Sequence, residues 1–315
     1  MPTLNTSAFA FTGTLASING ARALNISKRR LMKFAVSVGL PILRVGAPSS
    51  QHAVALASYK ALAMKCAIDF SRATLGLPAG YRQLDATEKV NISFWSGMVL
   101  AALVADEYIK TSRLLHAASF KKAQYLTITA GSGRRLADFV GQDQTGNWHV
   151  VEAKARQNSP SPNQESEWKQ QAQTVASVQG VVPMSRSYAL TNVGSNYSVN
   201  LVDPNPSDTI QRSLTFRDLS VAIIQGYYGS LYEWLSNTDA TITVQRGQQE
   251  IVTRLAGYEP SEREYLFLGL TKYTMESLQR NQIPERVVAQ EFADTYLGSD
   301  GIAITTSPTP ELMVD

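Results

Sequence analysis

Two strand-like runs separated by a short turn, residues 136–142 and 148–155, constrain the fold more than any other part of the sequence. The residues between them, 143–146, are Asp, Gln, Thr and Gly, which favour turns. Side chains alternate across a strand, so Glu152 and Lys154 project from the same face of the second run. The pattern predicts a hairpin within a sheet that carries an acid and a lysine side by side.

Asp138, on the first run, gives this hairpin a second acid. Trp148 and Val150 share the face of Glu152 and Lys154, so the charges extend an apolar face, where charge is costly unless it is paired or bound to a metal. Two carboxylates can hold a divalent cation, and a neighbouring lysine can orient the water that such a cation activates. The alternative is a surface hairpin in which Glu152 and Lys154 form cross-strand salt bridges and Asp138 is a polar residue at a strand end.

Composition restricts the class of protein without identifying a partner. The chain has 315 residues, 44% hydrophobic and 17% charged, enough to bury the core of one elaborated domain or of two small ones. Its net charge of +3 is compatible with a polyanionic partner but does not require one. Cys66 is the single cysteine, which excludes an internal disulfide, and we expect a cytoplasmic protein. The apolar run 94–105 is too short to span a bilayer, so no membrane association is predicted.

Hydrophobic periodicity and chain-breaking residues predict the remaining elements. Helices are expected over 50–72, 91–119, 164–179, 216–237 and 262–281, with a short one that starts at Lys28. Strands are expected over 125–130, 185–192 and 302–305, in addition to the two runs of the hairpin. Most of the last third of the chain is therefore predicted to be helical.

The order of a helix, three strands, a helix and a strand over residues 91–193 resembles the core of the PD-(D/E)XK nuclease superfamily, which has the restriction-endonuclease-like fold. Asp138 matches the first acid of the signature, Glu152 the second and Lys154 the lysine, while Ala137 stands where the signature has proline. The resemblance covers roughly a third of the chain. It implies an α/β fold with a mixed central sheet and helices on both faces.

The rest of the chain is expected to add helical regions at both ends of this core. We predict a helical N-terminal region over 1–120, whose last helix packs on the core, a nuclease-like α/β core over 121–200 and a mainly helical C-terminal region over 201–315. The helical regions could hold a protein partner or a second copy of the chain.

The resemblance implies a divalent-metal-dependent nuclease that hydrolyses phosphodiester bonds, with DNA as the expected substrate and bacterial defence or DNA processing as the setting. Asp138, Glu152 and the backbone carbonyl of Ala153 would bind Mg²⁺ or Mn²⁺, and Lys154 would orient the attacking water or stabilise the pentacovalent phosphorus. The alternative is a catalytically inactive nuclease-like fold that binds nucleic acid or a partner protein.

Further site residues are implied less specifically. Relatives often draw another acid from the helix before the sheet, which indicates Glu107 first and Asp106 second; a solvated helix face is the alternative for both. A glutamine on the helix after the lysine is a second such feature, and Gln171 is selected here over its neighbours Gln170 and Gln173, with a plain polar helix face as the alternative.

Two basic pairs flank the strands of the predicted site. Lys121 with Lys122, and Arg134 with Arg135, could contact phosphates or could serve only as solubilising charge. His149 projects opposite to Glu152 and is expected to be a core histidine.

Overall fold

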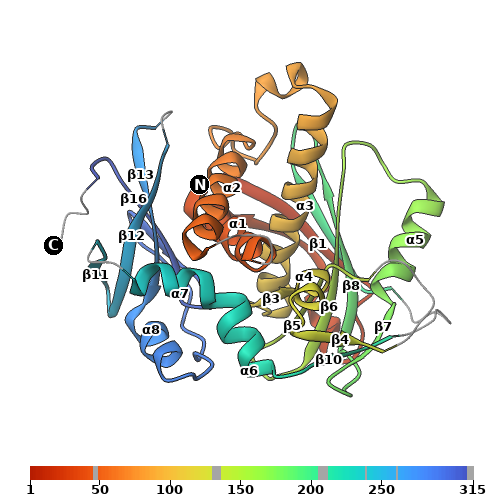
Figure 1. The fold of residues 1–315 in the computed structure, drawn as a ribbon. Coiled ribbons are helices and arrows are strands. Elements are labelled where there is room, and N and C mark those ends of the chain that lie inside the picture. The colour runs from red at the N-terminus through yellow and green to blue at the C-terminus, as the bar shows by residue number, and fades with distance from the viewer. Residues whose placement is uncertain (45–48, 130–135, 205–211, 238–239, 260–261, 311–315) are drawn as a thin grey trace. The chain divides into compact units, whose positions relative to one another are not determined.

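The predicted hairpin lies in a seven-stranded mixed sheet in the computed structural model, which describes residues 1–44, 49–129, 136–204, 212–237, 240–259 and 262–310 (Figure 1). The chain divides into two units, one formed by Met1–Ser27 and Met64–Arg217, the other by Lys28–Ala63 and Asp218–Asp315. Each unit is therefore assembled from two separate stretches of sequence. The division differs from the three consecutive regions expected from the sequence, because strands at the start of the chain pair with strands far along it.

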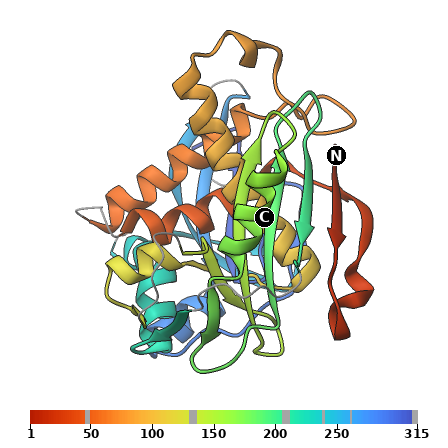
Figure 2. The same cartoon turned by 90° about the vertical axis from the view of Figure 1, so that its right-hand side faces the viewer.

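The first unit contains the seven-stranded sheet in the order β2-β1-β9-β8-β6-β5-β3. These strands are β1 (Thr3–Phe9), β2 (Gly20–Asn25), β3 (Leu114–His116), β5 (Phe139–Gln142), β6 (Trp148–Arg156), β8 (Ser185–Asn192) and β9 (Ser198–Val202). β3, β5 and β6 form an antiparallel meander, whereas β6 pairs with β8 and β1 with β9 in parallel. The described chain is thus α/β with a large mixed sheet, as the sequence predicted. The β1–β2 hairpin forms one edge of this sheet (Figure 2).

Helices cover both faces of the sheet around β6 (Figure 1). Helix α3 (Ala86–Ile109) starts at a capping box in which Asp85 and Glu88 each accept the other's backbone N–H. It approaches β6 closely at Gly97, where an added Cβ would lie 3.0 Å from the Cβ of Ala155. Helix α5 (Pro162–Ala172) packs on the opposite face, and it begins at Ser161 with a proline in its first turn.

Shorter elements complete the first unit. They are two 3₁₀ helices, η1 (Gly13–Ile18) and η2 (Ala79–Gln83), helix α4 (Ala117–Lys122), and a small sheet β4-β10-β7 formed by β4 (Leu126–Ile128), β7 (Val175–Val178) and β10 (Arg212–Phe216).

The second unit combines helices with a six-stranded sheet of order β11-β12-β13-β16-β15-β14. Its strands are β11 (Ile242–Arg246), β12 (Gln249–Glu259), β13 (Glu264–Thr271), β14 (Gln290–Glu291), β15 (Thr295–Leu297) and β16 (Ile302–Ser307). Its helices are α1 (Lys28–Arg44), α2 (Ser50–Cys66, which ends in the first unit), α6 (Leu219–Val221), the π-helix η3 (Ala222–Tyr228), α7 (Gly229–Ser236) and α8 (Lys272–Gln279). A fully buried ion pair, Lys33 Nζ to Asp300 Oδ2 at 3.0 Å, lies in its core, and the hydroxyl of Tyr227 donates to the same oxygen.

The expectation of a mainly helical C-terminal region was wrong, whereas the N-terminal region is mainly helical, as expected, but begins with two strands. Residues 1–25 form β1 and β2, and the predicted helix 262–281 divides into strand β13 and helix α8. The buried residues Leu266, Phe267 and Leu268 suit a strand, and the pairing of β13 with β16 outweighs local helix propensity. In the same way, the predicted helix 164–179 ends at Ala172, and β7 follows it.

The predicted helix 91–119 was also too long. Helix α3 ends at Ile109, the next residue Lys110 adopts the left-handed conformation at φ 55°, and the apolar residues Leu114 and Leu115 belong to strand β3. β3 therefore joins β5 and β6 to complete the three-stranded meander. The strand expected over 125–130 exists as β4, but it pairs with β10 in the small sheet.

Helix α3 is the one helix of the described residues whose length and composition would suit a membrane span, and 67% of its apolar window is buried within the structure. Burial of that extent is typical of the core helix of a folded unit.

Candidate functional site

The β5–β6 hairpin determines where the predicted site residues lie. Its register pairs Phe139 with Val151 and Gln142 with Trp148. Asp138 directly precedes β5, and its backbone carbonyl accepts the N–H of Ala117 at 2.9 Å. The start of β5 is thereby fixed to the start of α4, beside the buried middle of β6.

Asp138 and Glu152 are joined by two reciprocal hydrogen bonds. The N–H of Ala153 donates to Asp138 Oδ2 at 2.9 Å, and the N–H of Asp138 donates to Glu152 Oε2 at 3.1 Å. Each carboxylate is therefore held by the backbone beside the other one. The structure brings the two predicted acids together, and the side chain of Glu152 is fully buried.

Lys154 completes the cluster, together with a residue from α5. Its Nζ forms an ion pair with Glu152 Oε1 and donates to Gln171 Oε1 at 3.2 Å. The amide nitrogen of Gln171 donates in turn to the carbonyl of Leu136 at 3.3 Å. Gln171 thus connects the lysine to the segment that leads into Asp138. Of the two alternatives, Gln170 is exposed and Gln173 donates to the carbonyl of Pro204.

Burial makes the ionised forms of both acids unfavourable. It raises the pKa of Asp138, against the hydrogen bond from Ala153 and the charge of Lys154. It raises the pKa of Glu152 to about 8, and the charge of Asp138 adds to this increase while Lys154 opposes it. Two close acids that resist ionisation together can be stabilised by a proton or by a cation.

His116 is a neighbour of Asp138 that the sequence did not indicate. It lies on β3 opposite Phe139, and its Nδ1 accepts the N–H of Ser119 at 3.2 Å. Burial lowers the pKa of His116, while the charge of Asp138 acts in the opposite direction. No sequence spacing marks this histidine, because it reaches Asp138 only through the pairing of β3 with β5.

The structure does not bring the other predicted acids into the cluster. Within the ranges that the structure describes, no group of three or more His, Cys, Asp or Glu side chains could hold a metal ion, so Glu107 and Asp106 do not join Asp138 and Glu152. Both lie on α3, which packs on the face of β6 opposite to Glu152. The basic pair Lys121 and Lys122 is exposed in the last turn of α4. Arg134 and Arg135 lie outside the described residues.

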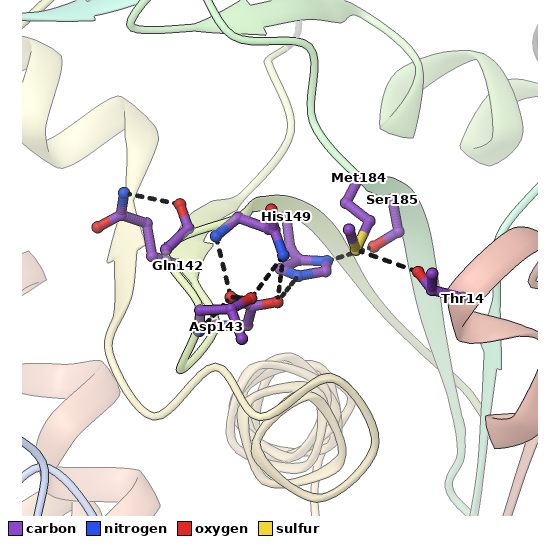
Figure 3. A network of polar contacts seen from close by, with 9 residues as sticks. Thr14, Gln142, Asp143, His149, Met184 and Ser185 are labelled. Carbon is purple, nitrogen blue, oxygen red and sulfur yellow. Dashed lines mark hydrogen bonds and ion pairs between the residues drawn. The ribbon is translucent and has the colours of Figure 1, made fainter.

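A second polar cluster occupies the turn end of the same hairpin (Figure 3). His149 Nδ1 is 2.8 Å from Ser185 Oγ, and its Nε2 is 3.3 Å from Asp143 Oδ2. Asp143 also accepts the N–H groups of Thr145 and Asn147. This Ser–His–Asp set does not suit nucleophilic catalysis, because His149 is fully buried and Ser185 is 2% exposed. His149 is a core histidine, as expected, and the cluster joins the turn to β8.

Burial alone would raise the pKa of Asp143, but the hydrogen bonds that it accepts from Asn147 and Thr145 hold this pKa at about 2. Burial lowers the pKa of His149, which keeps the imidazole neutral. The turn cluster therefore contains an ionised acid whose hydrogen bonds stabilise the hairpin.

No family model, curated protein or solved structure matches this chain.

Proposed function

We propose that the protein is a divalent-metal-dependent nuclease, with DNA as the expected substrate. The observation that carries the proposal is the interlocked pair Asp138 and Glu152, with Lys154 beside it on the same strand face. Two adjacent acids and a cationic side chain are the groups that metal-assisted phosphodiester hydrolysis uses, and shifted pKa values such as those of the two acids are typical of functional sites. Bacterial defence or DNA processing, and a cytoplasmic location, are proposed with it.

The arrangement of the elements supports a restriction-endonuclease-like core. Helix α3 precedes the meander β3-β5-β6, and helix α5 then leads to β8, which pairs in parallel with β6. This is the order of helix, three strands, helix and strand expected for a PD-(D/E)XK nuclease. We propose this fold for the middle of the first unit, with β3 in place of the strand expected over 125–130.

The donor atoms of the cluster suit Mg²⁺ or Mn²⁺. Both cations prefer oxygen ligands, and the two carboxylates supply them. Ala153 lies beyond the last residue pair of the β5–β6 ladder, and its N–H points to Asp138. The N–H and C=O of one strand residue point to the same edge of the strand, so the carbonyl of Ala153 also faces the side of Asp138. A bound cation would lower the pKa of a water molecule and neutralise charge on the phosphate.

The residues of the chain would orient the reactants. Lys154, which pairs with Glu152 in this structure, would direct its ammonium group at the attacking water or at a phosphate oxygen. Gln171 holds this ammonium group on one side through its side-chain oxygen. The position of the lysine therefore depends on α5 as well as on β6.

One observation favours the alternative of a catalytically inactive binding protein. Both oxygens of Glu152 already have partners, Oε2 with the N–H of Asp138 and Oε1 with Lys154. A cluster that satisfies itself in this way could serve as a scaffold. The two functions differ in one measurable respect, which is cleavage that depends on Lys154.

The test is cleavage of plasmid, linear and single-stranded DNA, and of RNA, with Mg²⁺, Mn²⁺ or EDTA. Lys154→Ala should leave binding of metal and of nucleic acid nearly unchanged and lower the cleavage rate by about a thousandfold, because the lysine acts mainly in the transition state. Lys169→Ala is a matched control, since Lys169 also pairs with a glutamate in the first unit but is exposed on α5. Identical behaviour of the wild type and Lys154→Ala on all substrates, with no metal bound in calorimetry, would establish the inactive alternative.

A further inference from the structure

Arg156 lies on β6 two residues beyond Lys154, and it has no part in the cluster described above. Alternation along the strand places its side chain on the face of Glu152 and Lys154. Arg156 is exposed, and its guanidinium stacks on the ring of Trp168 of α5, with 5.5 Å from Cζ to the ring centroid. The face of β6 that carries Glu152 and Lys154 therefore also carries a second cationic side chain, Arg156, which is accessible to solvent.

No residue that the structure describes accepts a hydrogen bond from the guanidinium of Arg156. Within the described part of the chain, this guanidinium makes no ion pair either, and the stack on Trp168 is its one side-chain interaction. The indole ring is buried and belongs to a small cluster with Ala172, Tyr188 and Leu190. An arginine on a fixed aromatic surface loses little further entropy when it binds a planar or tetrahedral anion.

Helix α5 contacts both cationic side chains, Lys154 and Arg156, through residues on one of its faces. Trp168 and Gln171 are three residues apart, which places them on neighbouring turns of one helix face, and they contact Arg156 and Lys154 respectively. Residues two apart on a strand are separated by about 6.6 Å. One nucleotide of a sugar–phosphate backbone can bridge that spacing.

We propose that Arg156 binds a backbone phosphate next to the scissile one, which would lie at the cluster of Asp138, Glu152 and Lys154. This inference rests on the proposed function, since it takes the cluster of Asp138 and Glu152 as the place of cleavage. A contact of this kind reads no base, so it positions the strand for cleavage and gives no sequence preference.

The experiment compares Arg156→Gln with wild type in two measurements. Binding of fluorescein-labelled single-stranded DNA, duplex DNA and RNA oligonucleotides is followed by anisotropy in EDTA at several salt concentrations. Arg156→Gln should weaken binding by about tenfold and reduce the slope of log K against log salt by about one. In cleavage assays, KM should rise by a similar factor while kcat changes less than about twofold.

Two further variants separate phosphate binding from a structural role. Arg22→Gln is the matched control, because Arg22 is also an exposed arginine that stacks on an aromatic ring, that of Tyr108 at 4.6 Å, but it lies on the edge strand β2. It should leave binding, salt slope and KM unchanged. Arg156→Lys keeps the charge without the planar stack and should fall between wild type and Arg156→Gln.

The outcomes distinguish this inference from the proposed function. If wild type cleaves and Arg156→Gln matches it in salt slope and KM, the inference is overturned while the nuclease proposal stands. If wild type binds without cleaving, and Arg156→Gln still lowers the salt slope, the phosphate contact is supported and the nuclease proposal fails. Equal losses in Arg156→Gln and Arg22→Gln, or no binding by wild type, would refute the phosphate contact.

Discussion

The two ends of the β5–β6 hairpin carry acids in opposite physical states. At the turn, Asp143 accepts several hydrogen bonds, and its pKa is held at about 2. At the open end, the partly buried Asp138 lies against the fully buried Glu152, and the pKa of Glu152 is raised to about 8. The turn cluster therefore stabilises the fold when it is ionised, whereas the open-end cluster destabilises it. A cluster that costs stability is the one in which a functional role is expected.

The largest predicted difference between the two clusters is in catalysis. Asp138→Asn should lower the rate of Mg²⁺-dependent cleavage by about a thousandfold or more, because it removes a ligand of the cation. Asp143→Asn should change that rate by less than about threefold at a temperature well below its melting point. Initial rates on the same DNA substrate measure both. Equal losses would show that cleavage depends on the integrity of the hairpin and not on the acids at its open end.

The second predicted difference is in stability. Asp143→Ala should lower the free energy of unfolding at neutral pH by about 1–2 kcal/mol, because the backbone and side-chain donors of Thr145 and Asn147 lose their acceptor and solvent screens part of this interaction. The folded pKa of Asp143 is depressed, so its contribution is present above the unfolded pKa of about 4 and is lost as pH falls towards 2. Urea unfolding at neutral and at acidic pH should show the gap between wild type and variant closing in acid. A gap independent of pH would mean that packing, not charge, is responsible.

The open-end cluster should show the opposite sign. The raised pKa of Glu152 means that the folded protein binds more protons than the unfolded chain between about pH 4.5 and 8, so stability falls as pH rises through this window. Glu152→Gln removes this loss and should raise the free energy of unfolding by about 1–3 kcal/mol at about pH 9 in EDTA. Mg²⁺ should stabilise wild type but not the variant. A destabilised Glu152→Gln protein at that pH would refute the comparison.

The smallest predicted effect tests the support that α5 gives to Lys154. Gln171→Ala should lower kcat by about tenfold, close to 1.4 kcal/mol, because the lysine loses its acceptor on that side. Its free energy of unfolding should change by less than about 1 kcal/mol. Gln170→Ala is the control, since Gln170 is exposed on the same helix. Equal kcat values for the two variants would exclude the support.

Local patterns predicted the parts of the site that one hairpin determines. Strands β6 and β8 have the expected bounds to within one residue, because alternation and turn residues are local signals. A local signal also supports Gln171 over its two neighbours. Trp168 is the large apolar residue of α5, and a residue three positions later lies on the same buried face of the helix. Local patterns do not show which face of the sheet α3 covers, so they could not exclude Glu107 as a third acid of the site.

Long-range pairing explains the larger errors in the fold. β3 is a strand because it lies beside β5, and β13 because it lies between β12 and β16. Short apolar runs suit either a helix or a strand, and partners distant in sequence decide between the two. The hydrophobic periodicity of one segment carries no information about which distant segment will pair with it.

The parallel pairing of β1 with β9 affects how the protein is made on the ribosome. Asn5 pairs with Ser198, so strand β1 is synthesised long before its neighbour exists. At common rates of synthesis the delay is roughly ten to forty seconds. During that time one edge of the β1–β2 hairpin has no partner, and an open edge invites pairing with other nascent chains. The polar residues Asn5 and Ser7 on that strand make such pairing less favourable.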